Sequence, residues 1–297
     1  YTNYIEFGKR LSIPIVTANR EILVDGSFDS LDLNEIELMI QNENPGALLI
    51  IPNDNPTGQF LNQQQLIDLA KICVKHNIWM VSDEAYRQLY YGEDGSSSVW
   101  KISEENVPGI AGTRISIESA SKVWNACGLR IGGLVTDNLD FHTKSVSEYT
   151  ANLCANAIGQ EIFGSLAHES HDDLKKWYQS QRDYYRGLIL PLRENLMNEI
   201  PGLIVTNPEA AIYFVIDFRN ICGDSFDAQE FVQFCASKGK VSIHDKDYTL
   251  LLAPMNGFYS DSKKGKTQMR VAMVEPKDLI QNTPQILSGL YWAYNNK

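Results

Sequence analysis

Short apolar segments recur along the first part of the chain, and each is followed by polar residues. Residues 47–51 and 78–82 are largely apolar runs of strand length, and residues 113–118 alternate polar with apolar side chains. Continuous apolar runs are typical of strands that are covered on both faces. A helical pattern begins at about Asn62, between the first two runs. Strand, helix, strand, connection, strand is the pattern of a parallel α/β sheet, so this order constrains the fold most.

Several chemically useful side chains follow these predicted strands directly. Ligands of parallel α/β sheets bind outside the carboxyl ends of the strands. The residues that fall there are Asn55, Asp83, Tyr86, Ser119 and Lys122. We therefore expect one binding site at this edge of the sheet.

Lys122 lies between hydroxyl groups and an arginine. A lysine amine forms a Schiff base with an aldehyde once its charge is suppressed by its neighbours. Ser119, Ser121 and Arg130 can hold a phosphate through charge-assisted hydrogen bonds. An aldehyde that also carries a phosphate is pyridoxal phosphate. The alternative is a surface lysine beside a glycine-rich turn.

Composition excludes several classes of partner. The chain has 297 residues and a formal net charge of −11, which argues against nucleic acid and anionic membranes as partners. No apolar run approaches the ~20 residues of a membrane span, and no secretory signal is present. We expect a cytoplasmic protein with a sizeable core.

The positions of the cysteine and histidine residues do not predict a metal site. The cysteines are widely spaced in apolar segments and are expected to be reduced core thiols: Cys73, Cys127, Cys154, Cys222 and Cys235. His168 and His171 lie beside acidic residues, but helix capping from Ser170 explains this segment better than metal ligation.

The rest of the chain predicts two domains, residues 1–185 and residues 186–297. Residues 12–16 and 21–25 are short strand candidates, and residues 139–168 read as a helical stretch. A helix over residues 174–198 should bury Trp177, Tyr184, Leu188 and Leu192. Beyond it, strands are expected at residues 203–206, 211–216, 241–243 and 269–273, with helices over residues 227–237 and 277–295.

The motifs, taken in this order, resemble those of the class I/II aminotransferases, which are fold-type I pyridoxal-phosphate enzymes. They are Asn55-Pro56-Thr57-Gly58, Asp83-Glu84-Ala85-Tyr86, Ser119-Ala120-Ser121-Lys122 with Gly128-Leu129-Arg130-Ile131-Gly132, and Met269-Arg270-Val271. The resemblance implies an α/β fold, with a mainly parallel large domain that is incomplete at its amino end and a smaller α+β carboxyl-terminal domain.

The resemblance also implies cofactor roles. Lys122 would form the Schiff base and then move a proton at the substrate α-carbon. Asp83 would pair with the pyridine nitrogen and keep it protonated. Tyr86 and Asn55 would hydrogen-bond the ring oxygen. The phosphate would be held by Ser119, Arg130 and Ser121.

The resemblance further implies substrate contacts for Arg270 and Asn55 and one more cofactor contact for Tyr1. Arg270 would clamp the substrate carboxylate with a bidentate pair, and its alternative is a salt-bridged surface arginine. Tyr1 aligns with an aromatic that stacks on the cofactor ring. Tyr213, in a stretch like another family motif, is interpreted as core rather than site.

The chain also departs from the family pattern. The resemblance leads us to expect about a hundred residues before Tyr1, where part of the phosphate site would lie. Residues 150–160, which carry a partner-subunit arginine in dicarboxylate-specific relatives, have no cation, so an aspartate preference is not supported there. A homodimer that acts on amino acids and 2-oxo acids is implied.

Other functions stay open at this point. A β-eliminating lyase or an enzyme like aminocyclopropane-carboxylate synthase would share the same cofactor anchors. A non-catalytic aminotransferase-like domain or fragment is the remaining alternative.

Overall fold

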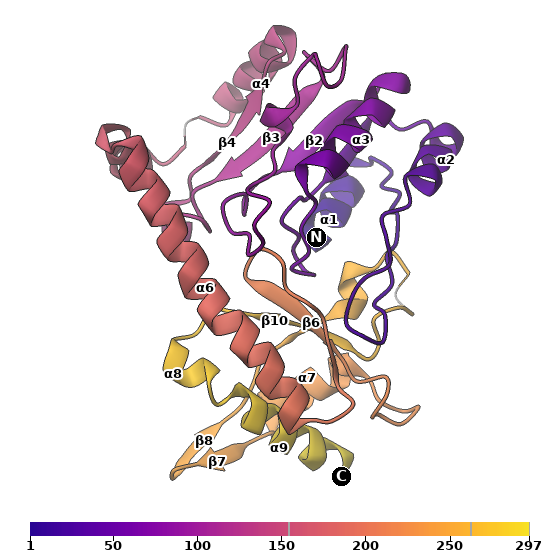
Figure 1. The fold of residues 1–297 in the computed structure, drawn as a ribbon, viewed down its shortest axis with the longest axis vertical. Coiled ribbons are helices and arrows are strands. Elements are labelled where there is room, and N and C mark those ends of the chain that lie inside the picture. Colours follow the sequence, from indigo (N-terminus) through magenta and orange to yellow (C-terminus); the bar gives the residue numbers. More distant parts are fainter. Residues whose placement is uncertain (154, 262, 297) are drawn as a thin grey trace.

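The first sheet lies at the top of the view in Figure 1. The computed structural model describes residues 1–153, 155–261 and 263–296. This sheet has the order β1-β2-β3-β4, formed by β1 (Ala47–Ile50), β2 (Trp79–Asp83), β3 (Arg114–Ser119) and β4 (Gly132–Thr136). The strands β1, β2 and β3 are parallel, and β4 is antiparallel to β3. The predicted, mainly parallel α/β sheet is confirmed.

Four helices pack around this sheet, and three of them begin with a side-chain cap. The helices of this layer are α1 (Thr2–Leu11), α2 (Leu33–Glu43), α3 (Gln63–Lys75) and α4 (Leu139–Ala151). Asp32 caps α2, and Asn62 and Gln65 form a reciprocal capping box at the start of α3. Apolar residues of α2 and α3 pack with those of the sheet in one buried cluster. Short 3₁₀ turns occur at Val99–Lys101, Cys127–Leu129, Ser165–His168 and Met255–Phe258.

The amino-terminal strand predictions were wrong. Residues 12–16 form no strand, and Ser12 ends α1 in the left-handed conformation. Residues 21–25 contribute only an isolated bridge between Ile22 and Phe28. Ile22 is buried against Ile204 and Val215 instead, so packing rather than a strand ladder holds this segment.

The predicted helical stretch over residues 139–168 is interrupted. The helix α4 ends at Ala151, Leu153 adopts a φ of 70°, and Asn156 caps the separate helix α5 (Ala157–Gly164). A left-handed residue and a new cap are incompatible with one continuous helix. Cys154 lies outside the described residues.

The long helix α6 (His171–Glu199) runs beside both layers (Figure 1). Ser170 caps it, as predicted. Leu188 and Leu192 are buried as expected, but Trp177 and Tyr184 are 36% and 49% exposed, so their predicted core positions were wrong. The buried residues of α6 all lie in its carboxyl-terminal half, which packs on the core of the second sheet, whereas Tyr178 in the other half is only partly buried against this core.

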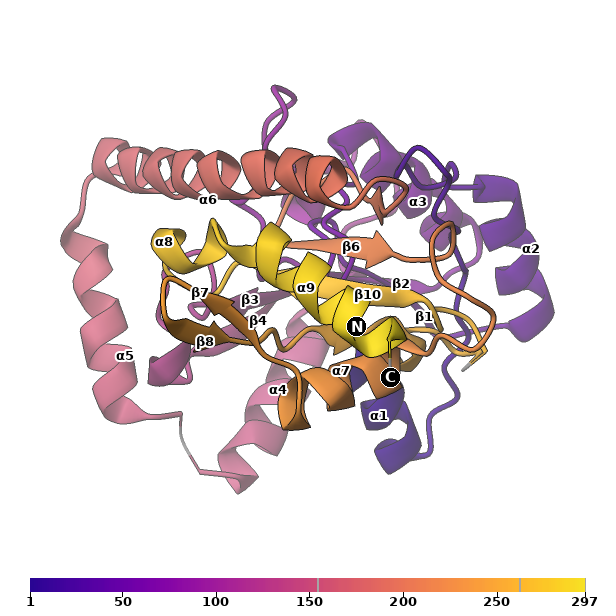
Figure 2. The same ribbon diagram turned by 90° about the horizontal axis from the view of Figure 1, so that it is seen from below.

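The second sheet is antiparallel. Its order is β5-β6-β10-β9, formed by β5 (Ile204–Val205), β6 (Tyr213–Asp217), β10 (Gln268–Ala272) and β9 (Ala253–Pro254). A separate hairpin joins β7 (Val241–Ile243) and β8 (Lys246–Tyr248). The helices α7 (Ala228–Ser237), α8 (Lys277–Ile280) and α9 (Thr283–Asn295) belong to this layer, and Figure 2 shows α9 crossing the face of β6 and β10. The expected helix over residues 277–295 is split, with Pro284 in the first turn of α9.

Backbone hydrogen bonds join the two layers. Tyr91 N donates to Glu209 O at 2.8 Å, and Ala211 N donates to Leu89 O at 2.8 Å. The carbonyl of Gly58 accepts from the amides of Glu209 and Ala210, each at 2.8 Å. These bonds fix the loop after β1 against the strand that begins at Tyr213.

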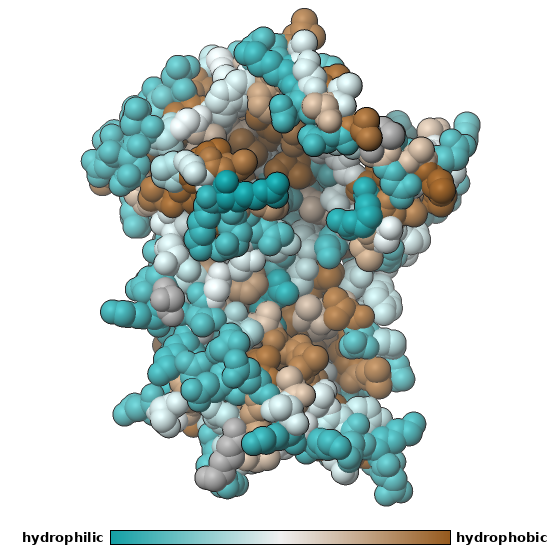
Figure 3. Space-filling model, turned by 180° about the vertical axis from the view of Figure 1, so that it is seen from behind, coloured by the Kyte–Doolittle hydropathy of each residue, from teal (hydrophilic) through white to brown (hydrophobic). Residues whose placement is uncertain are grey.

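One thiol that was predicted to lie in the core is exposed, and several large apolar side chains are exposed as well. Cys73 and Cys235 are buried, whereas Cys127 is exposed and so is not a core thiol. Seen from behind, the molecule shows hydrophobic side chains gathered around a hollow in its upper half (Figure 3). Exposed large apolar residues include Ile13, Ile15, Leu134, Val135, Ile158 and Ile162.

No helix within the described residues combines the length and apolar character needed to cross a bilayer. In the same part of the chain, no group of three or more His, Cys, Asp or Glu side chains is arranged to hold a metal ion.

Candidate active site

The carboxyl ends of the parallel strands meet at one edge of the first sheet. Asp83 is the last residue of β2, and Ser119 is the last residue of β3. The two strands are in parallel register, with Asp83 opposite Ile117. Asn55 follows the end of β1 in the adjoining loop. The predicted site residues of these strands therefore lie along the same edge.

Asp83 is held in place by two hydrogen bonds. Its Oδ2 accepts from the Tyr4 hydroxyl at 2.6 Å, and its Oδ1 accepts from Ala85 N at 3.1 Å. Burial, followed by the charge of Asp83, raises the pKa of Tyr4, so Tyr4 remains a neutral donor. Across the described ranges Asp83 forms no ion pair, and a carboxylate can accept further hydrogen bonds. The half-buried carboxylate thus suits a cationic N–H group.

Arg270 projects from β10 of the second sheet and reaches the loop after β1. Its Nη1 donates to Asn55 Oδ1 at 2.8 Å. The guanidinium carbon lies 4.6 Å from the ring centroid of Tyr213 and 5.2 Å from that of Phe258. The Nε of Arg270 is buried without a hydrogen-bond partner among the described residues. An arginine with unused buried donors between two rings is suited to binding a carboxylate.

Tyr86 is buried and contacts Tyr213, the ring over which Arg270 lies. Its hydroxyl lies 2.7 Å from the hydroxyl of Tyr213, and the two rings pack edge to face. Burial is the main cause that raises the pKa of Tyr86, with Tyr213 adding to it. Tyr213 is buried, as its interpretation as a core residue requires, but its ring and hydroxyl also contact two predicted site residues, which that interpretation missed.

The turn after β3 carries Lys122. Ser119 Oγ accepts from Ser121 N at 3.1 Å. Ala120 N donates to Ile131 O at 3.0 Å, and its carbonyl accepts from Ala126 N at 3.2 Å. These bonds close a compact loop in which Lys122 is half-buried.

Arg130 ends the same loop in the left-handed conformation, with a φ of 57°. It is exposed, and its Nη1 donates to Cys127 O at 2.8 Å. The neighbouring Ile131 is bonded to Ala120, so the backbone of Arg130 lies near the two serines. Within the described part of the chain, its side chain makes no hydrogen bond to them.

Tyr1 and Tyr4 extend the site toward α1. Tyr1 is 42% exposed and packs edge to face on Tyr4, with ring centroids 6.1 Å apart. Sequence reasoning missed Tyr4, because α1 was not predicted. The basic residues Lys9 and Arg10 in the last turn of α1 were the available signal for that helix.

Two groups of predicted residues result. Asn55, Tyr86 and Arg270 are linked through direct contacts and Tyr213, and Asp83 precedes Tyr86 on the same loop. Ser119, Ser121, Lys122 and Arg130 form the second group in the turn after β3. No hydrogen bond joins the two groups among the residues that the structure describes.

Comparisons with known proteins agree on one protein family. Residues 13–277 match the family model described as aminotransferase class I and II. The probable kynurenine–oxoglutarate transaminase of Saccharomyces cerevisiae is 26% identical over 65% of this chain, and the aspartate aminotransferase of Bacillus subtilis is 28% identical over 68%. The matches cover 41% and 49% of those two proteins, so the chain spans about half of their length.

A solved structure shows the same fold. Cystalysin from Treponema denticola, which contains a pyridoxal 5'-phosphate cofactor, superposes with a TM-score of 0.82 at 18% sequence identity. The match covers 99% of this chain and 69% of that chain.

Proposed function

The chain belongs to the class I and II aminotransferase family, and on that premise we propose that it transfers an amino group between an L-amino acid and a 2-oxo acid with pyridoxal phosphate as cofactor. The observation that carries the proposal is the contact between Arg270 and Asn55. This contact brings an arginine with an unused buried Nε to the edge where the parallel strands end.

The residues present fit the cofactor. Asp83 is a half-buried carboxylate that has a hydroxyl partner but no cation among the described residues, which suits a protonated ring nitrogen. When bound, pyridoxal phosphate supplies an aldehyde that reacts with amines and a ring that takes up electrons. We assign the attachment point to Lys122 and the phosphate contacts to Ser119, Ser121 and Arg130.

Each side chain then has a specific task. Asp83 holds the proton on the ring nitrogen, and Tyr4 keeps Asp83 oriented. Asn55 has its Oδ1 on Arg270, so its Nδ2 hydrogens are directed to other acceptors, such as the ring oxygen. Tyr86 can donate to the same oxygen. Lys122 carries the proton to and from the substrate α-carbon.

Arg270 binds the substrate carboxylate. Its planar fork can donate two parallel hydrogen bonds, while Tyr213 and Phe258 hold the guanidinium plane. The two relatives named above act, by their names, on different amino acids. A screen of amino donors with 2-oxoglutarate or pyruvate as the acceptor identifies the amino donor of this chain.

Covalent attachment tests the cofactor assignment. Pyridoxal phosphate followed by borohydride reduction should add the cofactor mass to the peptide that contains Lys122. Lys122→Ala should abolish this labelling, whereas Lys144→Ala, at an exposed position on α4, should not. Labelling only at other lysines would contradict the assignment.

Product analysis tests the reaction. Conversion of 2-oxoglutarate or pyruvate to the matching amino acid supports transamination. Release of ammonia and pyruvate without an acceptor would instead identify a lyase, and neither product would identify a non-catalytic domain. Arg270→Lys should raise KM for the amino donor about tenfold or more, because lysine cannot replace the bidentate contact.

Assembly and organisation follow as part of the same proposal. The exposed apolar residues on β4 and α5, among them Leu134 and Ile158, support a homodimer. Light scattering that gives a monomer mass at micromolar concentration would exclude a homodimer.

The proposed domain boundary near residue 185 falls within α6. It is supported by the position of the buried residues of this helix, which all lie beyond residue 185. A cytoplasmic location stays a prediction from the sequence.

A further inference from the structure

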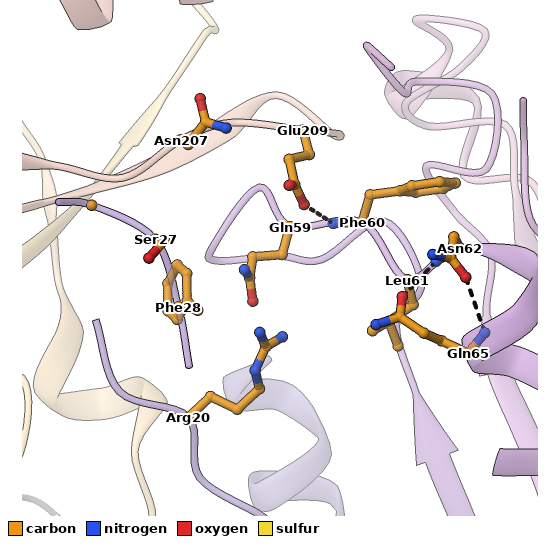
Figure 4. A pocket seen from close by; sticks show the side chains of 11 residues that line it. Arg20, Ser27, Phe28, Gln59, Phe60, Leu61, Asn62, Gln65, Asn207 and Glu209 are labelled. Carbon is orange, nitrogen blue, oxygen red and sulfur yellow. Dashed lines mark hydrogen bonds between the residues drawn. The ribbon is translucent and has the colours of Figure 1, made fainter. Parts of the chain in front are cut away.

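A polar cavity lies between the two layers, apart from the candidate active site. Its volume is about 280 Å³, and three segments line it: residues 20–28, residues 59–65 and residues 207–209 (Figure 4). The proposed cofactor and substrate residues are not part of its lining. The cavity nevertheless borders the loop that carries Asn55, because Gln59 and Phe60 continue that loop.

Arg20 supplies a cation at one side of the cavity. Its side chain is 26% exposed. Its Nε donates to the Asp29 carbonyl at 2.9 Å and also lies 3.8 Å from Asp29 Oδ1, so this carboxylate balances part of the charge of Arg20. Its Nη2 donates to the same oxygen, so three of the five guanidinium N–H groups have no hydrogen-bond partner among the described residues. Figure 4 shows the guanidinium directed toward the side-chain amide of Gln59.

Glu209 supplies a carboxylate at another side. Its Oε2 accepts from Phe60 N at 3.2 Å, and no hydrogen bond to Oε1 exists within the described ranges. The backbone of Glu209 is fixed because its amide donates to Gly58 O. In Figure 4 Glu209 and Arg20 lie on opposite sides of Gln59.

The charges around the cavity select a class of ligand. Burial lowers the pKa of Arg20, while Asp29, Asp54 and Glu209 act in the opposite direction through their negative charges. A simple anion would be attracted by Arg20 but repelled by these carboxylates. A simple cation would be attracted by the carboxylates but repelled by Arg20. A ligand with one charge of each sign satisfies both sides.

We propose that this cavity binds a free α-amino acid, with its carboxylate on Arg20 and its ammonium on Glu209. The volume lies at the lower end for ligand pockets, so the ligand is small. This site is separate from the one that contains Arg270 and does not depend on the proposed reaction.

Occupancy of the cavity would act on the contact between the layers. Gln59 and Phe60 belong to the loop of the first sheet, and Glu209 belongs to the segment that leads into β6. An amino acid held between them would favour the arrangement in which Asn55 reaches Arg270.

Ligand-observed saturation-transfer NMR on the full chain, with glycine and L-alanine as probes, tests the proposal. Arg270→Gln removes the proposed substrate clamp and should leave a binding event in place. Adding Arg20→Gln or Glu209→Gln to it should weaken that event about tenfold or more. Arg193→Gln is the matched control, because Arg193 also donates its Nε to a backbone carbonyl but does not line the cavity.

Acetate and methylammonium serve as single-charge probes. Each should bind about tenfold or more weakly than glycine. Acetate binding equal to that of glycine would overturn the zwitterion assignment. Loss of all binding in Arg270→Gln, with Arg20→Gln unchanged, would place every amino acid at the proposed active site and overturn the proposal.

Thermal unfolding controls for damage to the fold. If Arg20→Gln unfolds, Glu209→Gln decides, since this position is exposed and the glutamine amide oxygen can still accept from Phe60 N. Failure of cofactor labelling at Lys122 would refute the proposed function and leave this test unaffected.

Discussion

Side chains of the candidate site keep hydrogen-bonding capacity that their protein neighbours do not use. The Nε of Arg270 is buried and has no hydrogen-bond partner among the described residues. Asp83 accepts from the neutral hydroxyl of Tyr4, and it forms no ion pair with any described residue. Buried polar groups are normally satisfied, so such residues indicate a place for a ligand.

Tyr4→Phe removes the hydroxyl that donates to Asp83 at 2.6 Å. Hydrogen bonds to charged groups stabilise by about 1.5–3 kcal/mol, so we expect the free energy of unfolding to fall by about 1–2 kcal/mol. Denaturant unfolding measures this loss. Tyr184→Phe, at a residue that is 49% exposed on α6, is the control and should change stability little. Equal losses in both variants would contradict the role of Tyr4.

Asp54 gives a prediction about pH. Its carboxyl accepts from the Thr57 hydroxyl, yet burial is the larger effect and raises its pKa above the ordinary value of 3.8. Between 3.8 and the raised pKa, the folded state keeps a proton that the unfolded state has lost. Stability from this group is therefore present below the unfolded pKa and is lost as pH rises through the folded pKa.

Asp54→Asn removes that titration and retains an oxygen that accepts from Thr57. The melting temperature of the variant, relative to the unmodified protein, should therefore rise from about pH 3 to about pH 7. Thermal unfolding across this range measures the difference. A difference that is constant with pH would show that Asp54 titrates normally.

At the scale of elements, local pattern predicted some structures and long-range packing decided others. The apolar runs of β1 and β2 and the cap Ser170 are local signals, and each element formed as expected. The role of Tyr4 was not predictable in this way, because its partner Asp83 lies 79 positions away in the sequence.

The misplaced residues have the same cause. Trp177 lies on the face of α6 that periodicity marks as apolar, but it packs parallel to Trp124 at the surface, with ring centroids 6.3 Å apart. Ile22 joined the core of a sheet whose strands lie far along the chain. Which face of a segment is buried depends on partners that no local pattern specifies.

The carboxyl-terminal half of α6 should carry most of its contribution to stability. Leu196→Ala removes a fully buried side chain from the core of the second sheet, with an expected cost of about 2–5 kcal/mol. Leu139→Ala, at a residue that is 79% exposed on α4, should cost less than about 0.5 kcal/mol. Urea unfolding measures both. Similar costs would contradict the burial of α6.

At the scale of the whole molecule, a close backbone contact joins the two layers. Gly58 has a φ of +72°, and a Cβ added there would lie 2.1 Å from Tyr213 O. The loop of the first sheet can therefore approach β6 only because this residue is glycine.

Gly58→Ala should destabilise the protein by about 2–4 kcal/mol, through left-handed strain and the clash together. Gly95→Ala is the matched control: its φ is +78°, but a Cβ there meets nothing within 4 Å. The control should cost only the strain, about 1–2 kcal/mol. Unfolding measurements on both variants separate the two effects, and equal losses would show that the contact with Tyr213 is loose.

The bond between Arg270 and Asn55 has a consequence for the order of folding. These residues are 215 positions apart, whereas β2 and β3 are adjacent strands that lie much closer in sequence. Closing so large a loop costs conformational entropy before the contact stabilises anything, so distant pairings form late. On the ribosome, the first sheet can begin to fold long before Arg270 is synthesised. Pulsed hydrogen exchange during refolding should protect the amides of β2 before those of Glu209 and Ala211, which bond to the first layer, and the reverse order would contradict this sequence of events.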